Sequence, residues 1–160
     1  MKKIAAAIVL CLAAALVIVL IAQGQSVDRT PRTLAGPTLD GSGFDLSTIS
    51  GRSVVINFWG SWCKWCAKEA PDLVAFAKAH PDVLFVGVDV NDEDSAARAF
   101  SAKYTLPFLS VVDHSGTIAD HYDVTGYPTT VFLDSKHIER ARIVGAGSVQ
   151  AFAENLQKAL

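Results

Sequence analysis

The chain has few cysteines and almost no excess of charge of either sign, and each of these shortages argues against whole classes of function. Of its three cysteines, Cys11 lies in an apolar N-terminal segment, which leaves only Cys63 and Cys66 for the rest of the chain. A zinc site needs two more ligands at suitable spacing, and the four histidines are scattered singly. Ala67 stands where a c-type haem attachment motif requires histidine. The net charge of -2 indicates no nucleic-acid-binding face. We therefore expect no metal, no cofactor and no nucleic-acid partner.

The most informative motif that is present is the pentapeptide from Trp62 to Cys66, which follows the apolar run Val54–Phe58. Helical residues three apart have Cβ atoms roughly 5–6 Å apart, whereas a disulfide needs about 3.8 Å. The pair closes easily only if Cys63 lies at the helix N-terminus, where free N–H groups and the helix dipole favour a thiolate. Because a bridge across two residues removes little chain entropy, a purely structural disulfide is a weak alternative. The motif indicates a reversible redox couple.

The N-terminus predicts export of the remaining chain. Lys2 and Lys3 precede an apolar run from Ile4 to Ala22, long enough to span a membrane. Ala22-Gln23-Gly24 is similar to a signal-peptide cleavage site, so a secreted form is the alternative to a single-pass anchor. We predict a signal-anchor at 1–24, a tether at 25–36 and one domain at 37–160 that faces the periplasm or another extracytoplasmic side.

Patterns of apolar residues in the exported part alternate between strands and helices. We expect a hairpin of 38–39 and 44–46 around a turn at 40–43. Beyond it, the expected strands are 54–58, 83–88, 109–112, 129–133 and 138–144. Helices are expected at 63–79, at 94–103 with Asp94 as its cap, at 117–122 and from Ser148 onward. This order indicates an α/β sandwich with a mixed central sheet.

Two stretches carry a family resemblance. Asn57-Phe58-Trp59-Gly60-Ser61-Trp62-Cys63, followed by Cys66 and Glu69-Ala70-Pro71, resembles the membrane-tethered TlpA/ResA-like branch of the thioredoxin superfamily. Gly126-Tyr127-Pro128-Thr129 is similar to that family's cis-proline strand, and 88–122 resembles its helix-and-strand insert. The likeness runs from Pro37 to the C-terminus. It implies a thioredoxin-like three-layer sandwich with an N-terminal hairpin.

The resemblance also implies catalytic roles. Cys63 is expected to be the exposed nucleophile with a pKa below the usual 8.5 or so, and Cys66 to resolve the mixed disulfide. Thioredoxins have a buried aspartate on the preceding strand, where this chain has Asn57. Glu69 is therefore the expected active-site carboxylate, with a raised pKa if it is buried; a glutamate in the first turn that interacts with the helix dipole is the alternative. Pro128 is expected to be cis, with Tyr127 presenting backbone groups to an extended substrate.

The tryptophans and Lys64 complete the predicted site. Trp59 is expected to pack beneath it, whereas Trp62 and Trp65 are expected to form an apolar substrate-docking rim. Lys64 beside Cys63 should make the disulfide more oxidising. Trp65 stands where the family commonly has proline, and it could desolvate the site and oppose that effect. The two effects are of similar size, so the redox potential does not follow from the sequence.

The expected function is an extracytoplasmic thiol–disulfide oxidoreductase. The resemblance implies reduction of protein disulfides, for example during cytochrome c maturation, with electrons from a membrane thiol carrier. One alternative enzyme is a disulfide-forming oxidase. Another class is a redox-switched binding or chaperone module without turnover. A peroxiredoxin-like peroxidase ranks last, because Cys63 follows a tryptophan instead of lying in a Thr/Pro-rich loop.

Overall fold

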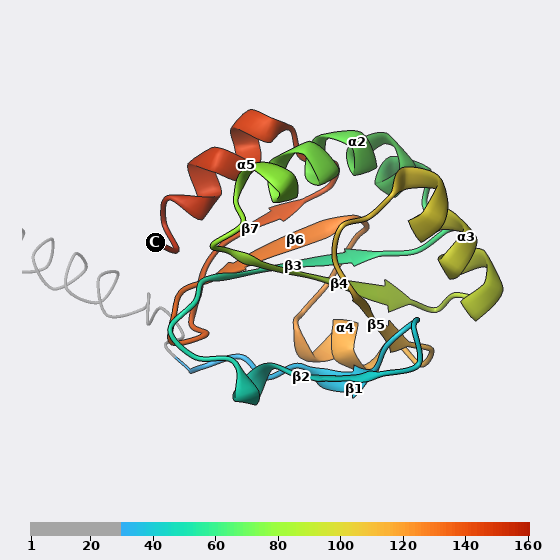
Figure 1. The fold of residues 1–160 in the computed structure, drawn as a ribbon, viewed down its shortest axis with the longest axis horizontal. Coiled ribbons are helices and arrows are strands. Elements are labelled where there is room, and N and C mark those ends of the chain that lie inside the picture. Colours follow the sequence, from blue (N-terminus) through green and yellow to red (C-terminus); the bar gives the residue numbers. More distant parts are fainter. Residues whose placement is uncertain (1–29) are drawn as a thin grey trace, which may run out of the picture.

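The computed structural model describes residues 30–160 and shows a three-layer α/β domain (Figure 1). The expected membrane anchor and Cys11 lie outside the described residues. Within residues 30–160, no helix is both long and apolar enough to cross a membrane. The central sheet has the order β5-β4-β3-β6-β7. Its strands are β3 (Val54–Trp59), β4 (Leu84–Val90), β5 (Ser110–Asp113), β6 (Thr129–Leu133) and β7 (Glu139–Val144).

The direction of the strands confirms the mixed sheet. β3 pairs in parallel with β4, and β4 with β5, whereas β6 runs antiparallel to both β3 and β7. Helices α2 (Lys64–Ala79), α3 (Asp94–Tyr104) and α5 (Val149–Leu156) cover one face. The other face carries α4 (Thr117–His121), the hairpin strands β1 (Ala35–Pro37) and β2 (Gly43–Asp45), and the 3-10 helix η1 (Leu46–Thr48). The thioredoxin-like fold predicted from the sequence is confirmed.

The apolar character of β3 explains why both faces are covered. Successive side chains of a strand point to opposite faces. Val54, Ile56 and Phe58 pack into the cluster on the α4 and hairpin side, while Val55 packs with α2 and α5 on the other side. All six residues of β3 are buried. The strand that leads into the cysteine motif is therefore fixed from above and below.

The hairpin differs from its expected position. The structure pairs Ala35 with Asp45 and Pro37 with Gly43, so the first strand ends before Thr38. Residues 38–42 form the turn, in which Thr38 Oγ1 and Ser42 N both donate to Asp40 Oδ1. Leu39 N donates to Ser110 O at the edge of β5. The expectation that 38–39 form the first hairpin strand was wrong because Thr38 bonds within the turn and Leu39 bonds to another sheet.

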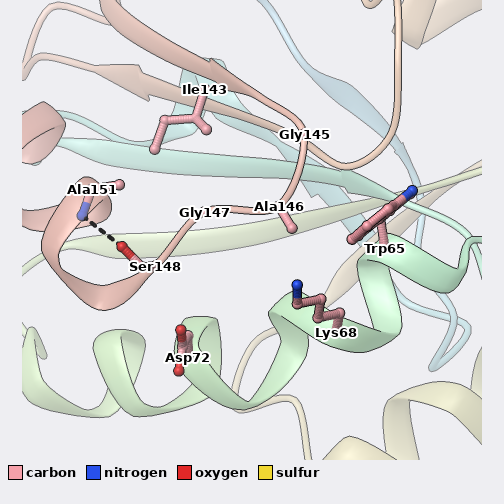
Figure 2. A pocket seen from close by; sticks show the side chains of 9 residues that line it. All are labelled: Trp65, Lys68, Asp72, Ile143, Gly145, Ala146, Gly147, Ser148 and Ala151. Carbon is pink, nitrogen blue, oxygen red and sulfur yellow. Dashed lines mark hydrogen bonds between the residues drawn. The ribbon is translucent and has the colours of Figure 1, made fainter.

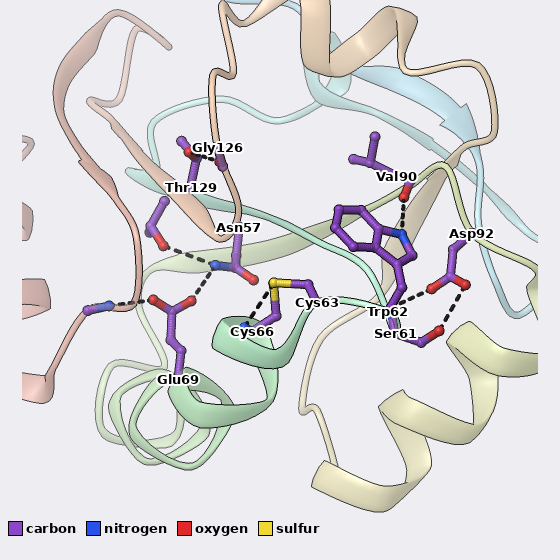
Figure 3. Close-up of a disulfide and its surroundings, with 12 residues drawn as sticks. Asn57, Ser61, Trp62, Cys63, Cys66, Glu69, Val90, Asp92, Gly126 and Thr129 are labelled. Carbon is purple, nitrogen blue, oxygen red and sulfur yellow. Dashed lines mark hydrogen bonds between the residues drawn. A yellow bond between two sulfur atoms is a disulfide. The ribbon is translucent and has the colours of Figure 1, made fainter.

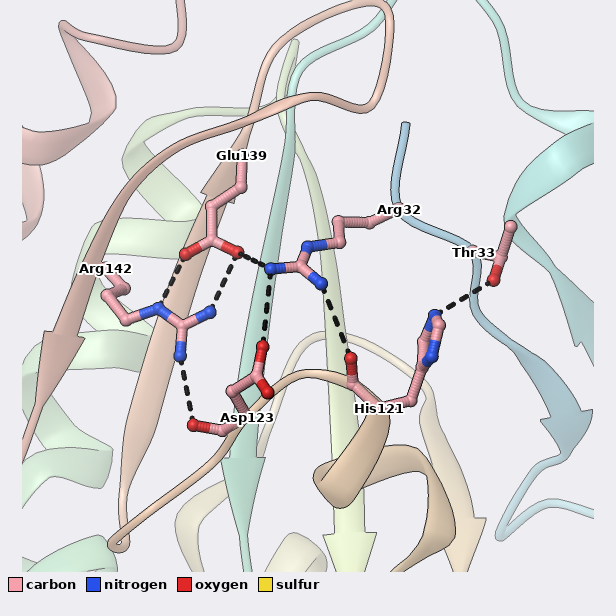
Figure 4. Close-up of polar contacts among 6 residues, drawn as sticks. All are labelled: Arg32, Thr33, His121, Asp123, Glu139 and Arg142. Atoms are coloured by element: carbon pink, nitrogen blue, oxygen red, sulfur yellow. Dashed lines mark hydrogen bonds and ion pairs between the residues drawn. The ribbon is translucent and has the colours of Figure 1, made fainter. Parts of the chain in front are cut away.

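The segment before β1 is held against the domain by a polar network (Figure 4). Arg32 forms ion pairs with Glu139 at 3.1 Å and with Asp123 at 3.8 Å, and Arg142 contacts Glu139 at 2.6 Å. Residues 30–36 fall in the range expected to form a tether, and the structure places Leu34 of this range in the core at 2% exposure. The proposed division of the chain at residues 24 and 36 stays a prediction.

The helix starts agree with the sequence patterns to within a residue, with one exchange of roles. Ser148 is the cap of α5, where its side chain accepts a hydrogen bond from Ala151 N. Asp94 was expected to be the N-cap of α3. It is instead the first residue of the helix, and Glu93 is the N-cap. The Asp94 carboxylate is used elsewhere, because Arg98 and His114 both contact it.

Candidate functional site

The two cysteines lie where β3 passes into α2, as expected from the motif. Cys63 is the cap residue of α2, with extended backbone angles, and Cys66 lies in the first turn. Their sulfurs form a disulfide with a Cα–Cα distance of 5.2 Å (Figure 3). Cys66 N donates a hydrogen bond to Cys63 Sγ at 3.0 Å. A free helix N–H therefore already points at the sulfur that would carry a thiolate.

The exposure of the cysteines differs from the expectation. Cys63 was expected to be exposed, yet in the disulfide form it is 5% exposed and Cys66 3%. Both belong to a buried cluster with Trp59, Ala70 and Phe100, and Tyr127 packs against its edge. The prediction of an exposed Cys63 is thus wrong for the oxidised protein, because neighbouring side chains cover its sulfur.

The loop before Cys63 is fixed by a carboxylate that sequence reasoning missed. Asp92, just after β4, accepts hydrogen bonds from Ser61 N at 2.5 Å and from Ser61 Oγ at 2.8 Å. Trp62 Nε1 donates to Val90 O at 3.1 Å (Figure 3). Nothing in the spacing of residues 61 and 92 indicates this contact, which depends on the parallel pairing of β3 and β4.

Glu69 is buried, at 2% exposure, and lies beyond the first turn of α2, so the alternative of a first-turn glutamate does not apply. Asn57 Nδ2 donates to Glu69 Oε1 at 2.8 Å, and Gly147 N donates to Glu69 Oε2 at 2.6 Å. Burial raises the pKa of Glu69 to about 7, although the bonds from Gly147 and Asn57 oppose the shift. The expected rise is confirmed. The carboxyl group can therefore take up or release a proton near neutral pH.

Asn57 and Gly147 were not predicted as partners of Glu69. Asn57 also donates to Thr130 Oγ1 at 3.0 Å, so its amide is fixed between β3, α2 and β6. Its polar side chain inside an apolar strand was the available signal. Gly147 gave none, since it is 78 residues away from Glu69.

The segment before β6 forms the second wall of the site. The Tyr127–Pro128 peptide bond is cis, as predicted. Pro128 O accepts a hydrogen bond from Gly145 N at 2.8 Å, which ties this segment to the end of β7. The Tyr127 ring contacts the edge of Trp62, with centroids 5.2 Å apart. Trp62 and Tyr127 are thus brought together beside the cysteines.

Trp65 and two lysines form the exposed part of the site. Trp65 is 50% exposed and Trp62 is 53% exposed. The ammonium groups of Lys64 and Lys68 lie 5.6 and 5.1 Å from the Trp65 ring centroid, within range of a cation–π interaction. Trp59, in contrast, is buried and donates to Ser110 Oγ, as expected for a packing residue.

A groove begins at Trp65 and follows the outer side of α2 (Figure 2). Its volume is about 590 Å³. Trp65, Lys68 and Asp72 form one wall, and the segment from Gly145 to Ser148 forms much of the other. Gly147 of that segment is the residue that donates to Glu69. Gly147 therefore contacts the buried acid and also lines the groove.

A thioredoxin-like fold with a disulfide at the start of a helix, a cis-proline strand and a buried acid defines a class: thioredoxin-fold proteins with a dithiol–disulfide site. Within residues 30–160, no group of three His, Cys, Asp or Glu residues could hold a metal ion. The model of the AhpC/TSA family matches residues 28–141. The chain belongs to this family.

Curated relatives support a more specific placement. The chain is 37% identical over 112 residues to the soluble secreted antigen MPT53 of Mycobacterium tuberculosis, and the match spans 65% of the length of each protein. It is 36% identical to the thioredoxin-like protein YneN of Bacillus subtilis, over 74% of this chain and 72% of YneN. It is 30% identical to the thiol-disulfide oxidoreductase ResA of Bacillus cereus, over 75% of this chain and 70% of ResA. The resemblance to the TlpA/ResA-like branch is confirmed.

Solved structures agree with this placement. One is a secreted Mycobacterium tuberculosis disulfide oxidoreductase homologous to E. coli DsbE, with a TM-score of 0.71, 31% identity and coverage of 78% of this chain and 94% of that one. Another is MTB dsbF, solved in mixed oxidised and reduced forms, with a TM-score of 0.74, 30% identity and coverage of 79% and 95%.

Proposed function

We propose that this protein is an extracytoplasmic thiol–disulfide oxidoreductase that reduces selected protein disulfides through Cys63 and Cys66. The observation that carries the proposal is the disulfide at the start of α2, one helical turn before the buried Glu69. Relatives named as thiol-disulfide oxidoreductases support the same chemistry.

The first step is attack by Cys63 on a substrate disulfide. Its thiolate forms a new S–S bond with one substrate sulfur, and the other substrate sulfur leaves as a thiolate and takes up a proton. The hydrogen bond from Cys66 N and the free N–H groups of the first turn of α2 favour the charged sulfur. These groups lower the cost of forming the nucleophile.

The second step is resolution by Cys66. Cys66 loses a proton, attacks Cys63 Sγ and restores the internal disulfide. The substrate sulfur that was bonded to Cys63 leaves as a thiolate and takes up a proton, which gives the second substrate thiol. The substrate gains two electrons and two protons overall. Glu69 is the proposed base for Cys66, because a buried carboxyl with a pKa of about 7 can accept a proton at neutral pH. Asn57 and Gly147 hold its oxygens in place.

The substrate is proposed to bind along the exposed aromatic rim. Trp62 and Trp65 are half exposed beside the buried cysteines, and exposed aromatic side chains commonly mark contact sites. Tyr127, next to the cis bond, would pair its backbone with an extended segment of substrate. The groove beyond Trp65 offers room for the next residues of that segment. Lys64 and Lys68 would favour a substrate without positive charge here.

The compartment and the electron source are part of the proposal. Residues 1–24 would anchor the protein in a membrane with the domain outside the cytoplasm, or would be removed from a secreted form. A membrane thiol carrier would restore the reduced form, and apocytochrome c is one candidate target. A measured potential of about -270 mV would support reduction, whereas one of about -120 mV would indicate a disulfide-forming oxidase.

The deciding experiment is reduction of insulin disulfides by the full-length protein. The wild type should turn over repeatedly in the presence of a reductant, and Cys63→Ser should not. Cys66→Ser should stall as a mixed disulfide on Cys63, which also captures the natural substrate. Cys11→Ser is the matched control and should keep wild-type turnover. Negligible wild-type turnover would contradict the proposal and favour a redox-switched binding module.

A further inference from the structure

A second buried acid lies on the other side of the cluster that contains the cysteines. Asp89, near the end of β4, pairs with Trp59 of β3 and with Val112 of β5. Paired residues on adjacent strands point to the same face of a sheet. Trp59 and Val112 both belong to the buried cluster that includes Cys63 and Cys66. Asp89 therefore points to the face of the sheet that carries the disulfide.

Asp89 lacks the partners that a buried carboxylate requires. The residue is 1% exposed, and no N–H or hydroxyl group of the described residues donates to either of its side-chain oxygens. An ionised carboxylate left without partners in such a place costs several kcal/mol or more. Glu69, by comparison, receives two hydrogen bonds. The environment of Asp89 thus favours the neutral acid.

The nearest charge reinforces this preference. Burial is the main cause that raises the pKa of Asp89, to about 8; the charge of the Asp92 carboxylate and a side-chain hydrogen bond between the two carboxyl groups, which needs a proton on Asp89, are the next causes. Asp92 is the residue that holds Ser61 at both N and Oγ. A proton on Asp89 therefore leaves a single negative charge, that of Asp92, at the contact with Ser61.

We propose that Asp89 is a positioning residue for the dithiol site: as a neutral acid beside the Asp92 carboxylate, it keeps the Asp92–Ser61 contact in place ahead of Cys63. When Asp89 loses its proton, repulsion between the two carboxylates weakens that contact and adds negative charge near the thiolate. The reactivity of Cys63 then changes with pH for a reason separate from its own ionisation.

The charged groups around Asp89 come from few elements. Asp92 in the loop after β4 and Asp94 at the start of α3 face it with negative charge. Its strand neighbours Trp59 and Val112 carry no charge, and α2 contributes Cys63 and Cys66 to the same cluster. Asp94 is also paired with Arg98 and His114, which reduces its effect.

The test is the pH dependence of Cys63 alkylation by iodoacetamide in the fully reduced, full-length protein, followed by peptide mass spectrometry from pH 6 to 10. In the wild type, the rate of Cys63 alkylation should show two inflections with pH. One comes from ionisation of the thiol, and the other is a change of about twofold in the rate, centred near pH 8. Asp89→Asn, which is neutral at every pH, should show only the first. Asp82→Asn, an exposed aspartate before the other end of β4, should keep both.

Two results would overturn the proposal: a single inflection in the wild type, or a second inflection that persists in Asp89→Asn. If Asp89→Asn does not fold, carbon-13 NMR titration of the Asp89 carboxyl in the reduced wild type decides instead. A midpoint near about pH 4, the ordinary value, would reject the role of Asp89, whereas one near 8 would support it. The proposal rests on Cys63 as the attacking thiol. Because alkylation needs no protein substrate, its outcome is independent of insulin turnover.

Discussion

At the scale of single residues, the buried carboxyl group of the site lies on helix α2 and not on the preceding strand β3. Asn57 stands where thioredoxins have a buried aspartate, and its amide cannot take up a proton at neutral pH. The structure uses Asn57 as a donor to Glu69 instead. Because burial raises the pKa of Glu69 to about 7, we propose that the acid–base role lies on α2 and that the strand residue orients it.

Glu69→Gln should therefore slow resolution by Cys66 more than attack by Cys63. Glutamine keeps the shape but cannot accept a proton, so we expect resolution to fall about 100-fold, at the lower end of general base catalysis. In the wild type, resolution should quicken as pH rises through about 7, since the ionised form is the base. Rapid-quench separation of the mixed disulfide measures both steps. Glu154→Gln, on exposed α5 surface, is the control; equal slowing of both steps in Glu69→Gln would count against the role.

At the scale of elements, the site is the meeting place of two chain segments that the sequence separates by 60 residues. The start of α2 supplies the sulfurs, and the segment before β6 supplies Tyr127 and Pro128. Thr129 of β6 pairs with Phe58 of β3, which brings that segment beside the cysteine loop. Both walls of the site thus depend on the antiparallel pairing of β3 and β6.

Pro128→Ala should impair docking or release of substrate. Pro128 is buried and its carbonyl ties the segment to Gly145, so replacing it should alter the wall that faces the substrate. We expect kcat/KM for insulin reduction to fall about tenfold, a loss of about 1.4 kcal/mol. Pro81→Ala, at an exposed proline before β4, is the matched control. Unaltered kinetics in a folded Pro128→Ala protein would remove the assigned role.

Trp65→Ala should weaken substrate binding while leaving the chemical step intact. The ring is half exposed and lines the groove, so its loss removes contact area without touching Glu69. We expect KM to rise about fivefold, or about 1 kcal/mol, with kcat nearly unchanged. Leu160→Ala, which removes another exposed apolar side chain far along the sequence, should behave as wild type. A lower kcat with constant KM would show that Trp65 acts on the chemistry.

At the scale of the whole molecule, two buried acids couple folding to pH. Burial raises the pKa of Glu69 from 4.5 to about 7 and that of Asp89 from 3.8 to about 8. The folded state therefore binds these protons more tightly than the unfolded state. The free energy of unfolding contributed by the pair should fall as pH rises from about 4 to about 8, and level off above that.

The double variant Glu69→Gln, Asp89→Asn should show a smaller loss of stability between pH 5 and pH 9 than the wild type. Neither replacement ionises, so the penalty of charging a buried carboxyl is absent. Urea unfolding of the oxidised proteins at the two pH values measures the difference, with Asp82→Asn as the control. Parallel behaviour of wild type and double variant would show that these acids do not set the pH dependence.

Most of the elements could be predicted because their signals are local. Each of these signals lies in the same short stretch of sequence as the element that it predicts. Examples are the apolar run at 54–58, the helical spacing of Ala97, Phe100 and Tyr104, and Ser148 before α5. The first hairpin strand was misplaced because Leu39 pairs with β5, an edge 71 residues away. Asp89 was passed over because the strand was expected to stop at 88, whereas Val90 after it is also buried in the sheet.

The sequence by itself determined the redox pair and the position of Cys63 outside the helix, since these follow from a short motif and from backbone geometry, while the resemblance of 126–129 to a known family implied that Pro128 is cis. Only the tertiary structure decided that both cysteines are buried, that Asn57 and Gly147 hold Glu69, and that Asp92 fixes Ser61 while no N–H or hydroxyl group of the described residues donates to Asp89. The reason is physical. A pKa and a hydrogen bond depend on which distant groups and how little water surround a side chain, and strand pairing sets both.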